Sequence, residues 1–400
     1  MFGDTPLVMV EDAAALRALV DHLRNEPVIG IDTEADSFHH YREKLCLIQI
    51  SDRERDYIID PLLVDDLAPL GEVLGDANIV KVLHGGDYDV VSLKRDYGLR
   101  IRNLFDTMIA AQFLALPRIG LADLIGRYFG HAIDKKYQRH DWASRPLLNE
   151  HLDYARGDTH FLLALREVLT VFLTRTGRLD AHAEECALLE ERDWTRDDDD
   201  ATAFLRVKKS NTLDADGLRV LRKLWRYRDG EARELDRPAF KVLPEEVLLA
   251  VAVQRPTDDD GLHHVMRRGS SMHRKHGQAL LQCVIEGLAD EEPLPQREAG
   301  ARRERKPEGG ANIDRLLGPL KDWRNRVVAR RGLAPVVVAN NNVLKEIARL
   351  MPTSLDELAA VPGIRRWQIA DFGDELISVV QSVEAPAASS NSKRRRRRKR

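Results

Sequence analysis

The stretch VIGIDTEAD, residues 28–36, joins an apolar run to three acids at every second position. Its first half is typical of a buried β-strand, because β-branched residues fit a pleated surface. Alternate side chains of a strand point to opposite faces, so Asp32 and Glu34 share one face, about 7 Å apart along the chain. Two negative charges at this distance repel each other unless a cation lies between them or one carboxyl group is protonated. The stretch therefore predicts either a cation site at a strand end or a strand that runs into a solvated acidic loop.

Short strand-like runs alternate with helical patterns through residues 7–85. Such alternation predicts a mixed α/β domain, in which helices cover a sheet. From about residue 104 to about residue 192, one segment after another shows the three- and four-residue apolar spacing of helices. The expected strands are LVMV (7–10), VIGIDTE (28–34), LCLIQIS (45–51), DYIID (56–60) and NIVKVLHG (78–85), and the expected helical patterns include residues 11–25, 106–116, 121–129 and 148–173.

The chain beyond residue 210 repeats itself at a fixed offset. RPTDDDGLHHV, which begins at Arg255, aligns with MPTSLDELAAV, which begins at Met351. The matched positions are mostly apolar or turn-forming, as two copies of one small helical domain require. The patterns together predict a first domain over residues 1–192, helical domains over 210–290 and 312–383, a charged linker over 291–311 and an unstructured basic tail over 384–400.

The net charge of −3 hides an asymmetry between the tail and the rest of the chain. KRRRRRKR, residues 393–400, carries eight positive charges, so the other 392 residues carry a net charge of −11. Eight adjacent like charges repel and bury nothing, so we expect no fixed structure there. The tail either keeps the protein soluble or binds phosphates in a salt-dependent way. A nuclear localisation signal, in a eukaryote, is a third interpretation.

Composition excludes several classes of protein. No apolar run reaches the ~18 residues of a membrane span, and the start of the chain lacks the pattern of a signal peptide. The three cysteines lie far apart without CxxC spacing, which excludes a zinc knuckle and a disulfide framework. We therefore expect a soluble intracellular protein with no membrane partner.

Two further stretches carry acids in suggestive positions. VLHGGDYDVVSL, residues 82–93, turns through two glycines into a helical pattern and brings Asp87 and Asp89 to the start of a helix. Helix capping alone favours a carboxylate there, and it suits Asp87 better. In YARGDTHFLLAL, residues 154–165, Tyr154 and Asp158 are four residues apart and so share one face of a helix. Each stretch alone has a structural explanation.

Together, the three stretches resemble the three motifs of the DEDDy class of 3′→5′ exonucleases. The matching residues are Asp32 and Glu34 in the first motif, Asp89 in the second, and Tyr154 and Asp158 in the third. The flanking stretches LCLIQIS, LFDTMIAAQFL, KKYQRHDWASRPL and YARGDTHFLL are similar to those of the ribonuclease D family and of its relative, the exonuclease subunit of the nuclear exosome. This resemblance covers most of residues 5–175.

The second motif offers two aspartates for one role. In the family the acid lies five residues beyond the histidine, and five residues beyond His84 is Asp89, so we assign the motif to Asp89 and leave Asp87 as a helix cap.

The two repeats resemble HRDC domains, small helical modules shared by RecQ-type helicases and ribonuclease D. One exonuclease domain followed by two HRDC domains is the bacterial arrangement, whereas the exosome subunit carries an additional N-terminal region. The resemblance implies an RNase H-like α/β exonuclease domain, with a mixed sheet flanked by helices, followed by two small all-α HRDC domains. It also implies a bacterial cytoplasmic enzyme, or a nuclear one if the source is eukaryotic.

The activity implied by the resemblance is 3′→5′ exonucleolytic hydrolysis of RNA with release of 5′-mononucleotides. Its substrate is RNA with a free 3′ end, tRNA precursors above all, and the expected state is a monomer. Two Mg²⁺ or Mn²⁺ ions are the expected cofactors, since hard cations prefer oxygen ligands and the site offers carboxylates without Cys or His.

The resemblance also assigns roles to the five motif residues. Asp32 bridges both ions, and Glu34 and Asp158 hold the ion that activates water. Asp89 supports the other ion through water, and Tyr154 orients the attacking water by a hydrogen bond.

Other residues are candidates for RNA contacts, each with a structural alternative. His39, His40 and Tyr41 follow the first motif directly, but solvated loop residues look the same. His84 lies beside the glycines, where a histidine packed at a strand end is an equal alternative. Lys136 and Gln138, with their neighbours Lys135 and Tyr137, precede Trp142, which packs this segment against the core in the structural alternative.

Two other functions remain open from the sequence. A DNA 3′→5′ exonuclease uses the same five residues, because recognition of the 2′-hydroxyl is made by groups around the metal site. A catalytically inactive RNA-binding scaffold would use the HRDC domains and the tail, although inactive relatives usually lack one of the acids.

Overall fold

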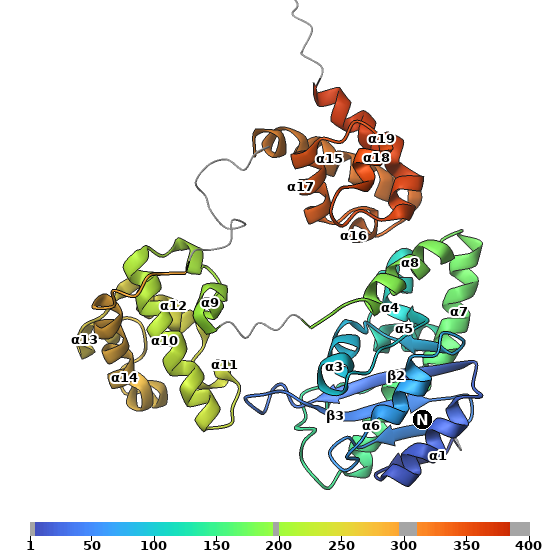
Figure 1. Ribbon diagram of the computed structural model, residues 1–400, viewed down its shortest axis with the longest axis horizontal. Coiled ribbons are helices and arrows are strands. Elements are labelled where there is room, and N and C mark those ends of the chain that lie inside the picture. The colour runs from blue at the N-terminus through green and yellow to red at the C-terminus, as the bar shows by residue number, and fades with distance from the viewer. Residues whose placement is uncertain (1–4, 195–199, 296–309, 385–400) are drawn as a thin grey trace, which may run out of the picture. The chain divides into compact units, whose positions relative to one another are not determined.

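The computed structural model describes residues 5–194, 200–295 and 310–384. Figure 1 shows one sheet flanked by helices, followed along the chain by two all-helical modules. The chain divides into two compact units. The first consists of Met1–Met108, Gly120–Leu169 and Glu185–Arg302, and the second of Ile109–Ile119, Thr170–Glu184 and Arg303–Arg400.

The six strands form a mixed sheet in the order β1-β4-β3-β2-β5-β6. The central strand β2 pairs antiparallel with β3 and parallel with β5, while β4 is antiparallel to β3 and parallel to β1. The strands are β1 (Leu7–Val10), β2 (Val28–Ala35), β3 (Leu45–Ser51), β4 (Asp56–Ile59), β5 (Val80–Leu83) and β6 (Leu104–Asp106). The mixed α/β fold predicted from the sequence is confirmed.

The helices around the sheet begin close to their predicted positions. They are α1 (Ala13–Leu23), α2 (Gly71–Leu74), α3 (Asp87–Tyr97), α4 (Thr107–Phe113), α5 (Leu121–Phe129), α6 (Asn149–His160), α7 (Leu162–Arg175) and α8 (Leu179–Glu190), with a 3₁₀ turn, η1, at Ala68–Leu70. Two details differ from the expectation. The strand β6 lies where only helices were expected, and the helical pattern over residues 148–173 is broken at Phe161.

Helix α6 packs across β2, β3 and β4 (Figure 1). Gly30 of β2 permits this close approach, since a Cβ there would lie 3.1 Å from the carbonyl oxygen of Thr159 and 3.3 Å from Cβ of Leu162. The strand and the helix therefore meet backbone to backbone. This contact brings the acidic end of β2 beneath α6.

The two helical modules repeat one another element by element. The first contains α10 (Ala215–Glu234), α11 (Ala239–Val242), α12 (Glu245–Gln254), α13 (Asp259–Leu262) and α14 (Ser271–Leu288), and the second contains α15 (Gly310–Arg331), α16 (Pro335–Val338), α17 (Asn341–Leu350), α18 (Leu355–Ala359) and α19 (Arg366–Glu384). Short elements precede the first: α9 (Asp200–Ala203), η2 (Phe204–Arg206) and η3 (Ser210–Thr212).

Equivalent positions in the two modules adopt equivalent conformations. Arg255 after α12 and Met351 after α17 both take a left-handed conformation, with φ of 50° and 51°. Asp258 and Ser354 cap the next helix, each accepting a backbone N–H three residues on. The internal repeat predicted from the sequence is thus confirmed at the level of single turns.

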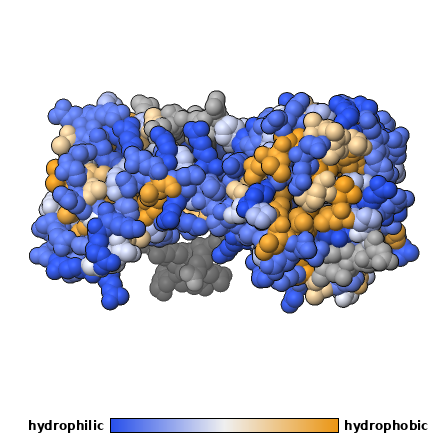
Figure 2. All heavy atoms as spheres, turned by 90° about the horizontal axis from the view of Figure 1, so that it is seen from below, coloured by the Kyte–Doolittle hydropathy of each residue, from blue (hydrophilic) through white to orange (hydrophobic). Residues whose placement is uncertain are grey.

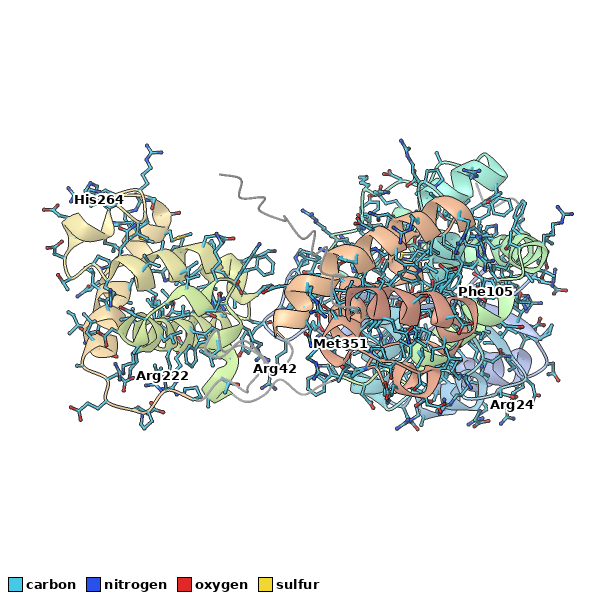
Figure 3. The ribbon with its side chains drawn as sticks, turned by 90° about the horizontal axis from the view of Figure 1, so that it is seen from above. Arg24, Arg42, Phe105, Arg222, His264 and Met351 are labelled. Atoms are coloured by element: carbon cyan, nitrogen blue, oxygen red, sulfur yellow. The ribbon has the colours of Figure 1, made fainter. Side chains whose placement is uncertain are left out.

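Arg222 anchors the first module internally (Figure 3). This residue of α10 is 2% exposed, and its guanidinium donates to Asp290 at 2.8 Å and to the carbonyl oxygens of Glu292 and Pro293 at 3.0 and 3.2 Å. The predicted linker over residues 291–311 therefore begins with residues bound to the module. The other predicted domain boundaries stay predictions.

In the second unit, helix α8 contacts the start of α19 of the second helical module. The carboxylate of Glu184 on α8 accepts the backbone N–H groups of Arg366 and Trp367 at the start of α19, at 2.8 and 3.1 Å. An acid is favoured there because the first N–H groups of a helix lack partners within the helix.

The face shown in Figure 2 is mostly hydrophilic, with one large hydrophobic area at the right of the view and smaller hydrophobic patches at the left. None of the helices in residues 5–194, 200–295 and 310–384 combines the length and the hydrophobicity that a bilayer-spanning segment needs. Cys46, Cys186 and Cys283 are all buried and free, in agreement with the absence of a disulfide framework expected from the sequence.

Candidate active site

A buried polar network fixes helix α6 on the sheet. Asp56 of β4 accepts hydrogen bonds from Nε of Arg156 at 2.8 Å and from Oγ of Ser51 at 2.6 Å, and His160 lies 3.0 Å away. The Ser51 hydroxyl is also 2.7 Å from that of Thr159. Asp56 is 1% exposed, so these bonds are made away from bulk water and hold the helix strongly. Tyr154 and Asp158 are thereby set in place on the same helix.

Three carboxylates converge where α6 crosses the end of β2. Asp32 and Glu34 come from β2, and Asp158 comes from α6. Each offers one oxygen, and these oxygens all lie within 4.8 Å of one another. The expectation that the two strand acids share a face, and that Asp158 joins them across the chain, agrees with this arrangement. Such a set of oxygens can hold a hard divalent cation.

The electrostatics of the cluster favour bound positive charge. Burial, together with the charges of Asp89, Asp158 and Glu34, raises the pKa of Asp32 well above its usual value. Burial and the neighbouring acids likewise raise the pKa of Glu34. Burial and Asp89 raise the pKa of Asp158 to about 7. Protonation or a cation must relieve this repulsion, and a cation does so without loss of the carboxylates' charge.

Asp89 lies beside the cluster but is not one of its three closest members. It is 6% exposed, in the first turn of α3, and its Oδ1 accepts the hydroxyl of Thr33 at 2.5 Å. Burial raises the pKa of Asp89 to about 6, Asp106 adds to the rise, and the Thr33 bond opposes it. Its charge in turn raises the pKa of Asp32 and of Glu34, so it belongs to the same electrostatic site.

Asp87 differs from Asp89 in its exposure and in its partners. Its side chain is 51% exposed and forms an ion pair with Arg192. It is not the cap predicted from the sequence, because Gly86 occupies the N-cap position and no side chain caps the helix. The carboxylate of Asp106 instead accepts the N–H of Gly86 at 2.8 Å and so fixes the turn before α3.

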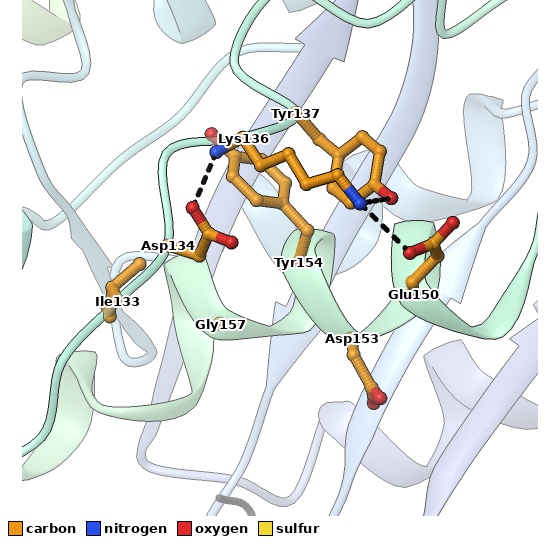
Figure 4. A pocket seen from close by; sticks show the side chains of 8 residues that line it. All are labelled: Ile133, Asp134, Lys136, Tyr137, Glu150, Asp153, Tyr154 and Gly157. Carbon is orange, nitrogen blue, oxygen red and sulfur yellow. Dashed lines mark hydrogen bonds and ion pairs between the residues drawn. The ribbon is translucent and has the colours of Figure 1, made fainter.

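Tyr154 borders a cavity of about 330 Å³ (Figure 4). Its ring meets that of Tyr137 edge to face at 6.0 Å and lies 5.8 Å from that of Trp142. Burial, followed by the charges of Asp158 and Glu34, raises the pKa of Tyr154 well above its usual value. The phenol therefore stays protonated at neutral pH and can donate a hydrogen bond.

The segment before α6 covers Tyr154. Lys136 donates to the hydroxyl of Tyr137 at 2.7 Å and to Glu150 at 3.2 Å, as Figure 4 shows. Trp142 is 1% exposed and packs in the cluster that contains Cys46, Leu47 and Ala155, so it anchors the segment to the core, as its structural alternative predicted. Gln138 is exposed.

The other candidate RNA-contacting residues have protein partners. Nε2 of His39 lies 2.9 Å from the carbonyl oxygen of Arg139, and the hydroxyl of Tyr41 donates to Asp229 at 2.8 Å.

His40 and His84 are likewise engaged. Nδ1 of His40 lies 2.7 Å from Asp236, a hydrogen bond that raises the histidine's pKa. Nδ1 of His84 lies 2.9 Å from the hydroxyl of Thr107, and burial lowers its pKa. Their contacts to RNA stay predictions.

Thr33 is a site residue that the sequence patterns did not single out. It stands between the two acids of the first motif, and strand alternation assigns it to the opposite face. Its bond to Asp89 forms because β5 ends at Leu83, which leaves room beside β2 for the start of α3. The only signal in the sequence is a hydroxyl residue flanked by the two acids.

A second group among the described residues has metal-ligand types: His22, Glu26 and Asp52. Here the carboxylate of Asp52 already accepts the backbone N–H groups of Glu54 and Arg55, both at 2.7 Å, and the hydroxyl of Tyr57 at 2.9 Å. These bonds lower the pKa of Asp52 despite its burial. The group is satisfied without a cation.

Comparison with known proteins places this geometry in context. The family model described as 3′-5′ exonuclease matches residues 7–173, and that described as HRDC domain matches residues 217–284 and 314–380. Ribonuclease D of Gluconacetobacter diazotrophicus is 30% identical over 374 residues, 93% of this chain and 92% of that protein. An exosome complex component 10 homolog of Caenorhabditis elegans is 28% identical, but the chain spans only 43% of its length.

Solved structures give the same picture. The crystal structure of Escherichia coli ribonuclease D, described as an exoribonuclease involved in structured RNA processing, matches with a TM-score of 0.68 and 27% identity, over 95% of this chain and 99% of that one. The catalytic core of RRP6 from Trypanosoma brucei matches with a TM-score of 0.62 and 33% identity, over 72% of this chain and 80% of that one.

Proposed function

Because the chain belongs to the ribonuclease D family and is a 3′→5′ exoribonuclease, we propose that Asp32, Glu34, Asp89, Tyr154 and Asp158 form its active site and that two Mg²⁺ or Mn²⁺ ions serve it. The observation that carries the proposal is the convergence of three carboxylate oxygens, from β2 and α6, within 4.8 Å of one another. Three buried acids with raised pKa values fit a divalent cation and are costly without one.

The four acids divide between the two ions in this proposal. Asp32 would help to hold both ions, and Glu34 and Asp158 would hold the first ion together with it. Asp89 has one oxygen engaged by Thr33, which supports a role at the second ion through water. When bound, the ions supply an activated water and stabilise the negative charge that develops on the leaving oxygen.

Tyr154 acts as a hydrogen-bond partner of the attacking water. Its raised pKa excludes a role as general base near neutral pH, since the phenolate is scarcely populated. Tyr137 and Trp142 hold its ring by contact, so the hydroxyl is aimed before substrate arrives. The cavity that Tyr154 borders adjoins the catalytic helix and suits the last nucleotides of the strand.

The natural substrate in this proposal is RNA with a free 3′ end, with tRNA precursors as the first class to test. The family relationship supports RNA over DNA, although the carboxylates themselves do not distinguish the two. The basic tail lies outside the described residues, and its grip on phosphates stays a prediction. The monomeric state and the cytoplasmic location expected from the sequence are likewise untested.

The test is digestion of a 5′-labelled single-stranded RNA. We expect a ladder that shortens one nucleotide at a time, release of 5′-monophosphates, and no reaction in excess chelator. A circular RNA should resist, and a matched DNA should be degraded more slowly. Cuts in the circular RNA, or full activity in chelator, would contradict the proposal.

The control variant is Asp32→Asn, which removes one ligand with almost no change of shape. We expect turnover to be lost while RNA affinity is kept. The metal-free variant should melt no lower than the wild type, because loss of one charge relieves repulsion in the cluster. Activity within a few-fold of the wild type would reject the metal role of Asp32.

A further inference from the structure

Gln49 is a buried side chain whose two polar atoms have no hydrogen-bond partner. The residue is 0% exposed, and neither Oε1 nor Nε2 makes a hydrogen bond in the structure. Buried amides are normally paired, so an unpaired one calls for an explanation. An aliphatic side chain of the same length would fill the space without this cost.

The strand register places Gln49 beside the proposed metal site. In the antiparallel pair of β2 and β3, Gln49 lies opposite Asp32. Directly opposed residues project to the same face with Cβ atoms about 4.5–5.5 Å apart, so the amide shares the face that carries Asp32 and Glu34.

The neighbours of Gln49 along β3 show that this face is turned to α6. Ser51, two residues on, bonds to Thr159 of α6. Leu47, two residues before, packs in the same cluster as Ala155 of α6. Gln49 lies between them and therefore faces the helix between Ala155 and Thr159, the stretch of α6 that carries Asp158.

We propose that Gln49 is a positioning residue of the metal site, whose amide holds the carboxylate of Asp32, directly or through one water, once a divalent cation is bound. The amide offers both a donor and an acceptor, which the surrounding carboxylates cannot. Groups that hydrogen-bond to metal ligands fix their orientation, and their loss typically weakens metal binding about 10–100-fold. This inference rests on the proposed function, because it requires that Asp32 holds a cation.

The test compares Gln49→Met with the wild type by calorimetric titration of Mn²⁺ and by melting in chelator. We expect the variant to bind Mn²⁺ about 10–100-fold more weakly. In chelator it should melt at the same temperature or higher, because the thioether removes an unpaired amide and keeps the volume. Equal Mn²⁺ affinity in the two proteins would overturn the inference, and so would a clear loss of melting temperature with unchanged affinity.

Ile50→Ala is the matched control, next to Gln49 on the same strand but on the opposite face, where Ile50 is 0% exposed and lies opposite Ile31. It should lower the melting temperature while its Mn²⁺ affinity stays within about threefold of the wild type. A loss of affinity equal to that of Gln49→Met would show that any disturbance of β3 has this effect and would overturn the specific role.

Three outcomes separate the causes of failure. If Gln49→Met does not fold, Gln49→Leu is measured in its place, and failure of both would show that the amide belongs to the core and overturn the inference. If the wild type itself does not bind Mn²⁺, the proposed function fails first. If the wild type binds and the variant binds equally, only the role of Gln49 fails.

Discussion

The hydroxyl of Thr33 donates a hydrogen bond to Oδ1 of Asp89 at 2.5 Å, across the edge between β2 and the start of α3. The bond engages one of the two oxygens of the acid. It also favours the ionised carboxylate in a buried position, since it opposes the rise of the pKa of Asp89 that burial causes. A residue outside the five motif positions thus tunes one of them.

Thr33→Val should make activity depend more strongly on pH. Without the hydroxyl, the pKa of Asp89 rises above its value of about 6, so a larger fraction is protonated near neutral pH. Turnover and Mn²⁺ affinity should fall most between pH 6 and 7 and recover toward pH 8. Thr33→Ser keeps the hydroxyl and should behave like the wild type. A pH profile of Thr33→Val that overlays the wild-type profile would show that the bond does not control Asp89.

The metal-free protein should lose stability as pH rises. The pKa of Asp158 is about 7 and that of Asp89 about 6, against about 3.9 in an unfolded chain. Acids with raised pKa values contribute stability that is complete below about pH 4 and is lost as pH rises through the folded values. Melting in chelator should therefore decline between pH 5 and 8, and Asp158→Asn should flatten this decline. A melting temperature that rises over this range in both proteins would contradict the electrostatic description.

Substitution of Asp87 and of Asp89, the two aspartates at the start of α3, should have different effects on turnover. Asp89→Ala should abolish most turnover with little loss of melting temperature. Asp87→Ala removes only an exposed ion pair with Arg192, worth about 0–1 kcal/mol, and should leave turnover nearly intact. Parallel measurements of turnover and melting decide the matter, and a larger catalytic loss in Asp87→Ala would mean that the second motif is assigned to the wrong residue.

Asp56→Ala should strongly destabilise the first unit. It leaves the guanidinium of Arg156, whose side chain is 8% exposed, without its carboxylate partner, at a cost of about 3–5 kcal/mol. Glu167→Ala is the matched control, because its pair with Arg53 is exposed on both sides and contributes about 0–1 kcal/mol. Urea unfolding of both variants measures the difference. Equal effects would show that the network beneath α6 does not hold the helix.

Much of the fold could be predicted from the sequence because its local signals were strong. The strands β2 and β3 are rich in β-branched and aliphatic residues, and the two helical modules repeat each other closely. The strand β6 was not predicted because it has only three residues, Leu104–Asp106. These residues are extended because they pair with β5, not because of a local preference. The break between helices at Phe161 was not predicted because the helical spacing of apolar residues continues across it.

The positions of the three acids of residues 28–36 show a limit of prediction from sequence patterns. Alternation correctly grouped Asp32 with Glu34, but by the same rule Asp36 would join them. A shift of register between Glu34 and Ala35 ends the alternation, and Asp36 is 0% exposed, with its Oδ1 accepting the N–H of Lys44 at 2.8 Å. Register shifts depend on the partner strand, so the acid's place could not be read from its own strand.

The most direct test of the account is diffraction from crystals soaked in Mn²⁺, recorded where manganese scatters anomalously. The account predicts two peaks about 4 Å apart. One should lie among Asp32, Glu34 and Asp158 and the other between Asp32 and Asp89, and both should be lost or greatly weakened in Asp32→Asn. No peak at these acids, or a peak only at His22, Glu26 and Asp52, would contradict it.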